Sequence, residues 1–174
     1  LTDAVRKRDM KMCMYYSLTE WTNPLYRWTV DTLKSIDEYV EKHLHPQFKE
    51  MVDMFSPSLV FSDGDWDFDY KTFKSDELVS YYFDKVGEEA IVNDRWGGGI
   101  DYGYVTPEYS EAIKQTERPW AECRGLSRSF GLNRNADLES YVTSEELIRH
   151  FVRLVAAGGG LTINVGPAAD GSIP

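Results

Sequence analysis

The chain has few cysteines and histidines and no long hydrophobic run. Cys13 and Cys123 are its only two cysteines, too few for a disulfide framework or for inferring a redox compartment. His43 and His45 precede a predicted helix remote from the strand ends, and a zinc site would need further ligands nearby, so no zinc site is predicted there. No apolar segment approaches the roughly 18 residues of a membrane-spanning helix, and no signal peptide is recognisable.

Basic residues are also scarce relative to acidic ones. Nineteen Lys and Arg residues against 29 Asp and Glu residues give a formal net charge of −10 and a pI near 4.8. Such a charge repels phosphate backbones and excludes nucleic acid as an expected partner. It suits a neutral ligand, such as a sugar without phosphate or sulfate.

The chain does contain an alternation of strand-like and helix-like segments. Hydrophobic residues make up 42% of the 174 residues, enough for a sizeable core. Apolar runs predict strands at residues 11–17, from Leu59, at 90–93 and at 161–165, and apolar residues at helical spacing predict helices at 46–55, after Ser75 and after Thr143. Thr143 and Glu146 form a predicted capping box, and the helix that follows is expected to bury Leu147, Phe151, Leu154 and Val155.

Strands that are apolar throughout and separated by helices predict a parallel sheet covered by helices, an α/β fold. A closed (β/α)₈ barrel needs about 250 residues, whereas this chain offers four or five strand units. We therefore expect residues 1–174 to be one partial barrel domain, truncated at both ends.

The segment at residues 59–66 carries the strongest functional signal. Its apolar strand ends in Asp63, Gly64, Asp65 and Trp66, and ligands of parallel α/β folds collect at the carboxyl ends of strands. The indole of Trp66 offers a flat face for stacking on a sugar ring. The alternative is that Asp63 and Asp65 cap a following helix and that Trp66 belongs to the core.

Several further polar residues follow predicted strands and are expected on the same face. They are Tyr16, Glu20, Asp94, Arg95, Glu108, Glu122 and Arg124. Retaining glycosidases use two carboxyl groups about 5 to 5.5 Å apart, one as nucleophile and the other as proton donor and then acceptor. Asp63 with the basic Arg95 nearby fits the nucleophile, and Asp65 is the rival.

Six motifs occur in one order along nearly the whole chain. They are residues 14–26 (MYYSLTEWTNPLY), 62–66 (SDGDW), 92–97 (VNDRWG), 106–109 (TPEY), 129–135 (SFGLNRN) and 158–167 (GGGLTINVGP). In this series the chain resembles the alpha-L-fucosidases of glycoside hydrolase family twenty-nine.

The resemblance implies a retaining exo-glycosidase that releases terminal alpha-L-fucose from fucosylated oligosaccharides or glycoproteins, without a metal or organic cofactor. It implies the later portion of a (β/α)₈-like TIM barrel, with the N-terminal half of the barrel and its pocket histidines lying upstream of Leu1. Many relatives are lysosomal, secreted or periplasmic. By the same resemblance Asp63 is the nucleophile, while Tyr16 and Arg95 are substrate-binding residues; the stacking role of Trp66 adds a third.

Two glutamates compete for the role of acid and base. Glu108 in Thr-Pro-Glu-Tyr matches the position used by some relatives, whereas others use a glutamate directly after the tryptophan of a Trp-Glu-x-Cys stretch. Here that stretch has Ala121 at the glutamate position and Glu122 one residue later. Because adjacent strand residues point to opposite faces, the shift favours Glu108 and leaves Glu122 as the second candidate.

Two other functions remain open at this point. Ala121 and the absent histidine-bearing portion are compatible with a non-catalytic fucose-binding or scaffold barrel. A barrel glycosidase with another sugar specificity is the third possibility.

Overall fold

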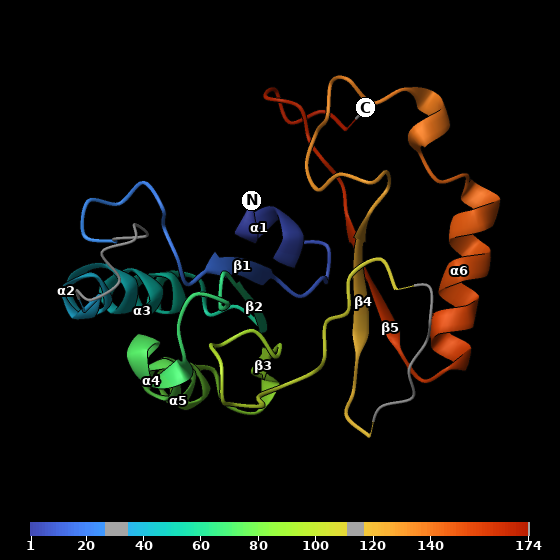
Figure 1. Cartoon of the computed structure of the whole chain (residues 1–174). Coiled ribbons are helices and arrows are strands. Elements are labelled where there is room, and N and C mark those ends of the chain that lie inside the picture. Colours follow the sequence, from blue (N-terminus) through green and yellow to red (C-terminus); the bar gives the residue numbers. More distant parts are fainter. Residues whose placement is uncertain (27–34, 111–116, 174) are drawn as a thin grey trace. The chain divides into compact units, whose positions relative to one another are not determined.

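The computed structural model describes residues 1–26, 35–110 and 117–173. The chain divides into two compact units, Leu1–Gly103 and Tyr104–Pro174, and each has its own parallel strands and helices (Figure 1). The predicted parallel α/β architecture is therefore present in both units. Within the described ranges, no helix combines the length and the apolar character needed to cross a bilayer.

The first unit is built on a three-stranded parallel sheet. Its strands are β1 (Cys13–Ser17), β2 (Leu59–Asp63) and β3 (Ile91–Val92), and they lie in that order in the sheet. The helices of this unit are α1 (Thr2–Arg6), α2 (Asp37–Tyr39), a π-helical turn (Val40–Leu44), α3 (His45–Phe55), α4 (Tyr70–Phe73), α5 (Ser75–Val86) and a 3-10 turn (Gly87–Glu89). Three predicted strands and the helix predicted at 46–55 are thus confirmed.

The two faces of this sheet have different surroundings. Tyr16 and Val60 point toward the helices and are buried, and the Tyr16 ring packs edge-on against Phe48 of α3 at 5.2 Å between centroids. Because side chains alternate along a strand, Tyr15 and Phe61 lie on the opposite face, where their rings stack at 6.1 Å. The helix-covered face forms the core, and the other face is free to carry polar function.

Aromatic side chains dominate the core between the sheet and the helices. Trp96 is fully buried and meets Phe48 edge-on at 5.9 Å, and its indole N–H donates to the Asn93 carbonyl at 2.9 Å. The buried Tyr82 hydroxyl donates to the Pro57 carbonyl at 2.9 Å. Each buried ring contributes about 2 to 3 kcal/mol of transfer free energy, and its polar group keeps a partner.

The second unit pairs two parallel strands with one long helix. β4 (Ala121–Gly125) and β5 (Gly160–Asn164) run side by side, and α6 (Ser144–Ala156) packs against β5 (Figure 1). A 3-10 turn (Leu138–Ser140) precedes α6. Residues 105–109 run parallel to β4, because Val105 and Glu108 form bridges with Trp120 and Cys123. The capping box is confirmed: Thr143 Oγ1 accepts from the Glu146 N–H at 3.2 Å, and Glu146 Oε2 accepts from the Thr143 N–H at 2.9 Å.

The structure corrects the prediction that Ser75 caps a helix. Ser75 is the first helical residue of α5, and its buried hydroxyl donates to the Trp96 carbonyl at 2.5 Å. Lys74, with a left-handed φ of 52°, precedes it instead. The hydroxyl of Ser75 therefore joins α5 to the loop after β3 and is not used to cap the helix.

The structure also corrects the predicted buried stripe of α6. Leu154 is fully buried, but Phe151 and Val155 are 47% and 52% exposed in this chain. The spacing of the apolar residues predicted the helix correctly, but α6 packs mainly against β5 and buries only one of the four side chains. Apolar periodicity defines a helix and a stripe, whereas burial depends on what packs against it.

Candidate active site

Asp63 is the last residue of β2, and both of its carboxylate oxygens have partners. The Tyr15 hydroxyl donates to Oδ2 at 2.6 Å, and Arg95 Nη1 donates to Oδ1 at 2.8 Å. The Asp63 and Arg95 side chains are 18% and 17% exposed, so the ion pair is shielded but still reachable. Charge-assisted hydrogen bonds of this kind hold a carboxylate in a fixed orientation.

The parallel register of β1 and β2 brings Tyr15 to Asp63. Ser17 pairs with Asp63 and Tyr15 with Phe61, so the Tyr15 side chain lies on the same face as the carboxylate. The Arg95 guanidinium lies over the Phe61 ring, with its central carbon 5.3 Å from the ring centroid. The Phe61 ring therefore packs against both side chains that bind Asp63, namely Tyr15 and Arg95. Sequence reasoning missed Tyr15 and Phe61, because both belong to runs that look like ordinary buried strand.

A buried side-chain network fixes the backbone that carries Arg95. Asn93 Oδ1 accepts from the Ser62 N–H and Asn93 Nδ2 donates to the Ser62 carbonyl, both at 2.8 Å. The Ser62 hydroxyl also contacts the Arg95 carbonyl. Ser62 and Asn93 are both fully buried. The loop after β3 is thus joined to β2 directly behind Asp63, which positions the guanidinium.

Gly64 allows the chain to turn directly after Asp63. Its φ is +72°, and a Cβ there would lie 2.6 Å from Thr19 Oγ1 and 2.8 Å from Ser17 Oγ. The Leu18 N–H donates to the Asp63 carbonyl at 2.8 Å. The turn after β2 therefore packs tightly on the turn after β1, and only glycine fits both the backbone conformation and the space.

Asp65 and Trp66 follow in the same loop but differ from Asp63. Burial raises the pKa of Asp65, against the opposing effect of hydrogen bonds from the backbone N–H groups of Asp65 and Gly97. These bonds fit a loop-holding role rather than nucleophilic attack. Trp66 is 62% exposed, so the structure excludes the alternative that it belongs to the core.

The structure does not bring Tyr16 to this site. Its side chain is 7% exposed, and its hydroxyl contacts the Leu44 carbonyl at 3.1 Å and Gln47 Oε1 at 3.0 Å. Burial raises the pKa of this phenol well above its ordinary value. Tyr16 therefore serves the helix-covered core, and its neighbour Tyr15 contacts Asp63. This placement is a correction to the expectation that Tyr16 binds substrate.

In the second unit, Glu108 and Glu122 lie on opposite faces. Glu108 is exposed and is in register with Cys123, whereas Glu122 is one residue earlier in β4. Alternation along the strands therefore turns Glu108 away from the face that carries Glu122. An exposed carboxyl is the one that a sugar can reach.

Glu122 is fully buried beneath α6. His150 Nε2 lies 2.9 Å from its Oε2, and Arg124 Nη1 lies 3.5 Å from its Oε1. The prediction that Glu122 and Arg124 follow a strand is wrong, since both lie within β4. The signal was hidden because the positions facing the helix are charged rather than apolar. Complete burial and a histidine partner speak against Glu122 as a proton donor to substrate.

The histidines near the first helices do not form a metal site. His43 Nε2 lies 2.5 Å from Glu20 Oε2, while the buried His45 Nε2 lies 3.0 Å from the Phe73 carbonyl. Across residues 1–26, 35–110 and 117–173, no three His, Cys, Asp or Glu side chains are grouped so as to hold a metal ion. The two histidines each have a separate structural partner.

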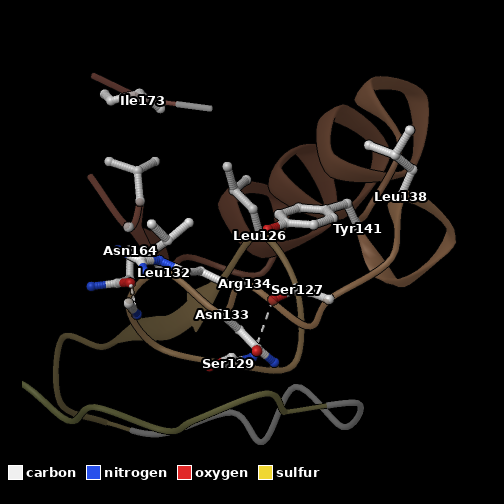
Figure 2. A pocket seen from close by; sticks show the side chains of 14 residues that line it. Leu126, Ser127, Ser129, Leu132, Asn133, Arg134, Leu138, Tyr141, Asn164 and Ile173 are labelled. Atoms are coloured by element: carbon white, nitrogen blue, oxygen red, sulfur yellow. Dashed lines mark hydrogen bonds between the residues drawn. The ribbon is translucent and has the colours of Figure 1, made fainter. Parts of the chain in front are cut away.

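A pocket of about 340 Å³ lies at the carboxyl ends of β4 and β5 (Figure 2). Its walls join the loop after β4 to the residues after β5: Asn164 Oδ1 accepts from the Gly131 N–H at 2.8 Å, and a Cβ on Gly166 would lie 2.2 Å from Leu132 N. Arg134 and Tyr141 add polar groups to the wall. The motifs at 129–135 and 158–167 thus meet here, in a pocket that the sequence did not predict.

Comparisons with known proteins indicate the family to which the chain belongs. The chain is 34% identical to an alpha-L-fucosidase of Dictyostelium discoideum over all of this chain and 40% of that protein. It is 30% identical to the tissue alpha-L-fucosidase of Homo sapiens over 99% of this chain and 39% of that protein. The chain therefore spans about 40% of the length of these relatives.

Solved structures give the same result. The crystal structure of the Thermotoga maritima alpha-fucosidase matches with a TM-score of 0.79 and 33% identity, over 100% of this chain and 40% of that one. The same enzyme in complex with fucose matches with a TM-score of 0.78 and 32% identity over the same shares. The model of the family described as alpha-L-fucosidase matches residues 1–174. This chain belongs to the alpha-L-fucosidase family, a family of glycoside hydrolases.

Proposed function

We propose that this chain forms part of the catalytic domain of a retaining exo-alpha-L-fucosidase, with Asp63 as the nucleophile. The observation that carries the proposal is the geometry around Asp63: a carboxylate at the carboxyl end of a parallel strand, oriented by Arg95 and Tyr15. Retaining glycosidases need such an ionised, fixed and reachable carboxylate. Fucosylated oligosaccharides or glycoproteins are the proposed substrates.

The proposed domain is a (β/α)₈-like barrel of which this chain supplies the later portion. Two observations support it: the strand pairs of the described residues are parallel, and the helices connect strands as in βαβ units. The remaining strands would come from the other part of a longer protein, in keeping with the 40% share of the relatives' length. The face of the sheet that carries Tyr15, Phe61 and Asp63 would then line the barrel interior.

The proposed reaction has two steps. Asp63 attacks C1 of the fucosyl residue, the bond from C1 to the leaving oxygen breaks, and Glu108 transfers its proton to that oxygen. Water then attacks C1, its proton returns to Glu108, and the bond to Asp63 breaks to release fucose with retained configuration. Arg95 and Tyr15 receive the carboxylate charge again as Asp63 leaves. No metal or organic cofactor takes part in this scheme.

Glu108 is the proposed acid and base because it is exposed, whereas Glu122 is fully buried and bound to His150. A proton donor must reach the leaving oxygen at hydrogen-bonding distance. We assign Glu122 to joining β4 with α6. The exposed Trp66, three residues after the proposed nucleophile, is the proposed stacking surface for the substrate.

The test is to place Asp63→Gly in the full-length protein and add azide. Hydrolysis of an aryl alpha-L-fucoside should fall by about a thousandfold or more. Azide fits the space left by the carboxylate and attacks from the same face of the sugar, so part of the turnover should return as beta-L-fucosyl azide. Unchanged hydrolysis would end the assignment.

Asp65→Gly is the matched control, because it removes the rival carboxylate from the same loop. It should retain hydrolysis and yield no fucosyl azide. If Asp65→Gly gives the azide product and Asp63→Gly does not, the nucleophile is Asp65.

A further inference from the structure

A cationic pocket lies in the second unit, between β4, α6 and the residues after Thr-Pro-Glu-Tyr. It has a volume of about 730 Å³. The residues that line it are Tyr109, Ser110, Arg124, Arg128, His150 and Arg153. No carboxylate is among these residues. All six residues belong to the second unit, whereas Asp63 and its partners belong to the first.

Three guanidinium groups converge on this pocket although the chain carries a net charge of −10. Several cations elsewhere in the chain have acidic partners, such as Lys11 with Glu89 and Arg149 with Glu145, both at 2.5 Å. Among the described residues, Arg128 and Arg153 have no such ion pair. Grouping like charges without a counter-ion costs free energy, so a local excess of this kind indicates an anionic ligand.

Glu122 behind the pocket does not neutralise it. Its single charge is shared between His150 Nε2 at 2.9 Å and Arg124 Nη1 at 3.5 Å. Arg124 Nε is buried and has no hydrogen-bond partner in the described part of the chain. The Arg124 guanidinium lies over the Tyr109 ring, at 5.5 Å from its centroid, which fixes the plane of the guanidinium. Arg124 is thus held in place with hydrogen-bonding capacity left over.

We propose that this pocket binds a tetrahedral oxyanion, a sulfate or phosphate group. Guanidinium groups bind such oxyanions through paired N–H donors, and three of them around one pocket match the several oxygens of the ligand. Tyr109 contributes its ring as a wall, since its hydroxyl already accepts from the Gly125 N–H and contacts the Ser127 carbonyl. Oxyanion binding in this pocket is expected whether or not the protein has the proposed fucosidase activity.

The test is calorimetric titration of the full chain with sodium sulfate and with sodium phosphate, against sodium chloride at equal ionic strength. We expect saturable binding of one oxyanion and no saturable binding of chloride. In Arg128→Met/Arg153→Met the affinity should fall by about tenfold or more, because charge-assisted hydrogen bonds are lost. Both side chains are exposed and their removal relieves like-charge repulsion, so the thermal unfolding temperature in chloride should not fall.

Arg149→Met is the matched control, because it removes an exposed arginine of α6 that pairs with Glu145 outside the pocket. It should bind oxyanion as the parent chain does. Absence of saturable oxyanion binding would overturn the proposal, and so would equal weakening in Arg149→Met and the double variant, which indicates general screening.

A second arm separates the sources of the oxyanion. A sulfated oligosaccharide that binds more tightly than inorganic sulfate, while its desulfated form does not bind, identifies an ester carried by a glycan. Equal affinity for the sulfated oligosaccharide and inorganic sulfate identifies a site for the oxyanion itself. In both cases the double variant must weaken binding; retained affinity in that variant would overturn the assignment to this pocket.

Discussion

Each unit contains a carboxylate held by an arginine and a second partner, but the two carboxylates are placed differently. Asp63 is the last residue of its strand, faces away from the helices and is 18% exposed. Glu122 is the second residue of its strand, faces α6 and is fully buried. The same ion-pair chemistry therefore has opposite consequences. At the end of β2 the ion pair orients the proposed nucleophile, whereas beneath α6 it joins a strand to a helix.

The largest effect that distinguishes the two carboxylates should be on catalysis. Asp63→Asn in the full-length protein should lower kcat/KM on an aryl alpha-L-fucoside by about a thousandfold, because a neutral amide cannot attack C1. Its free energy of unfolding should change by no more than about 1 kcal/mol, since Asp63 lies at the rim of the sheet. Release of the aryl leaving group measures the rate, and urea unfolding measures the stability. A variant that loses stability but keeps its rate would remove the distinction.

The reverse pattern is expected for Glu122→Gln. Removing the buried carboxylate charge leaves Arg124 without its counter-charge and weakens the contact with His150, so the free energy of unfolding should fall by about 3 kcal/mol. The kcat of the folded fraction should be retained. Glu145→Gln on the exposed face of α6 is the control and should change the free energy of unfolding by less than about 0.5 kcal/mol. If Glu122→Gln keeps its stability and loses kcat, Glu122 rather than Glu108 is the proton donor.

The neighbouring tyrosines of β1 allow a finer comparison. Tyr15→Phe removes the hydrogen bond to Asp63 and should lower kcat by about tenfold with little effect on stability. Tyr16→Phe removes the contacts to Leu44 and Gln47 and should lower the free energy of unfolding by about 1 kcal/mol with kcat unchanged. Steady-state kinetics and urea unfolding of both variants measure these effects. If Tyr15→Phe lowers stability and Tyr16→Phe lowers kcat, then Tyr16 rather than Tyr15 faces Asp63.

The smallest expected effect is a pH dependence of stability from His45. Burial, the main cause, lowers the pKa of His45 below its ordinary value of 6.5. The unfolded chain therefore binds the proton more readily, and His45 should reduce stability as the pH falls through 6.5 toward the lower folded-state value. At higher pH it has no such effect. Unfolding of the parent chain and of His45→Gln between pH 7.5 and 5 should show a smaller pH dependence in the variant, with His43→Gln as the control.

The strand ends of the first unit were predictable from the sequence, but the orientation of their side chains was not. The run before Asp63 is apolar and its end is polar, and this contrast places the carboxylate correctly. Tyr15 and Tyr16 are chemically identical neighbours in another such run. Which of them faces the helices depends on the packing of Phe48 against the sheet, a contact between residues distant in sequence. The order of residues within a strand therefore gives alternation but not its phase.

In the second unit the hydrophobic pattern itself was misleading. β4 buries Glu122, which contacts Arg124 of the same strand and His150 of α6, so the strand has no apolar alternation to detect. The capping box of α6 was predictable because it depends on two residues three positions apart. The pocket at the ends of β4 and β5 was not, because it requires loops from two motifs to meet. Contacts between residues close in sequence, such as the capping box, can be predicted from the sequence. The buried contact of Glu122 with His150 joins residues far apart in sequence and cannot.

The link between Asn93 and Ser62 has a consequence for the ageing of the protein. The Asn93 carboxamide offers one donor and one acceptor to Ser62, as a further peptide group of the sheet would. Hydrolytic deamidation to aspartate would replace the donor by an acceptor and set it against the Ser62 carbonyl in a fully buried position. Deamidation of Asn93 during storage would therefore weaken the contacts that position the Arg95 backbone, although Asn93 is fully buried.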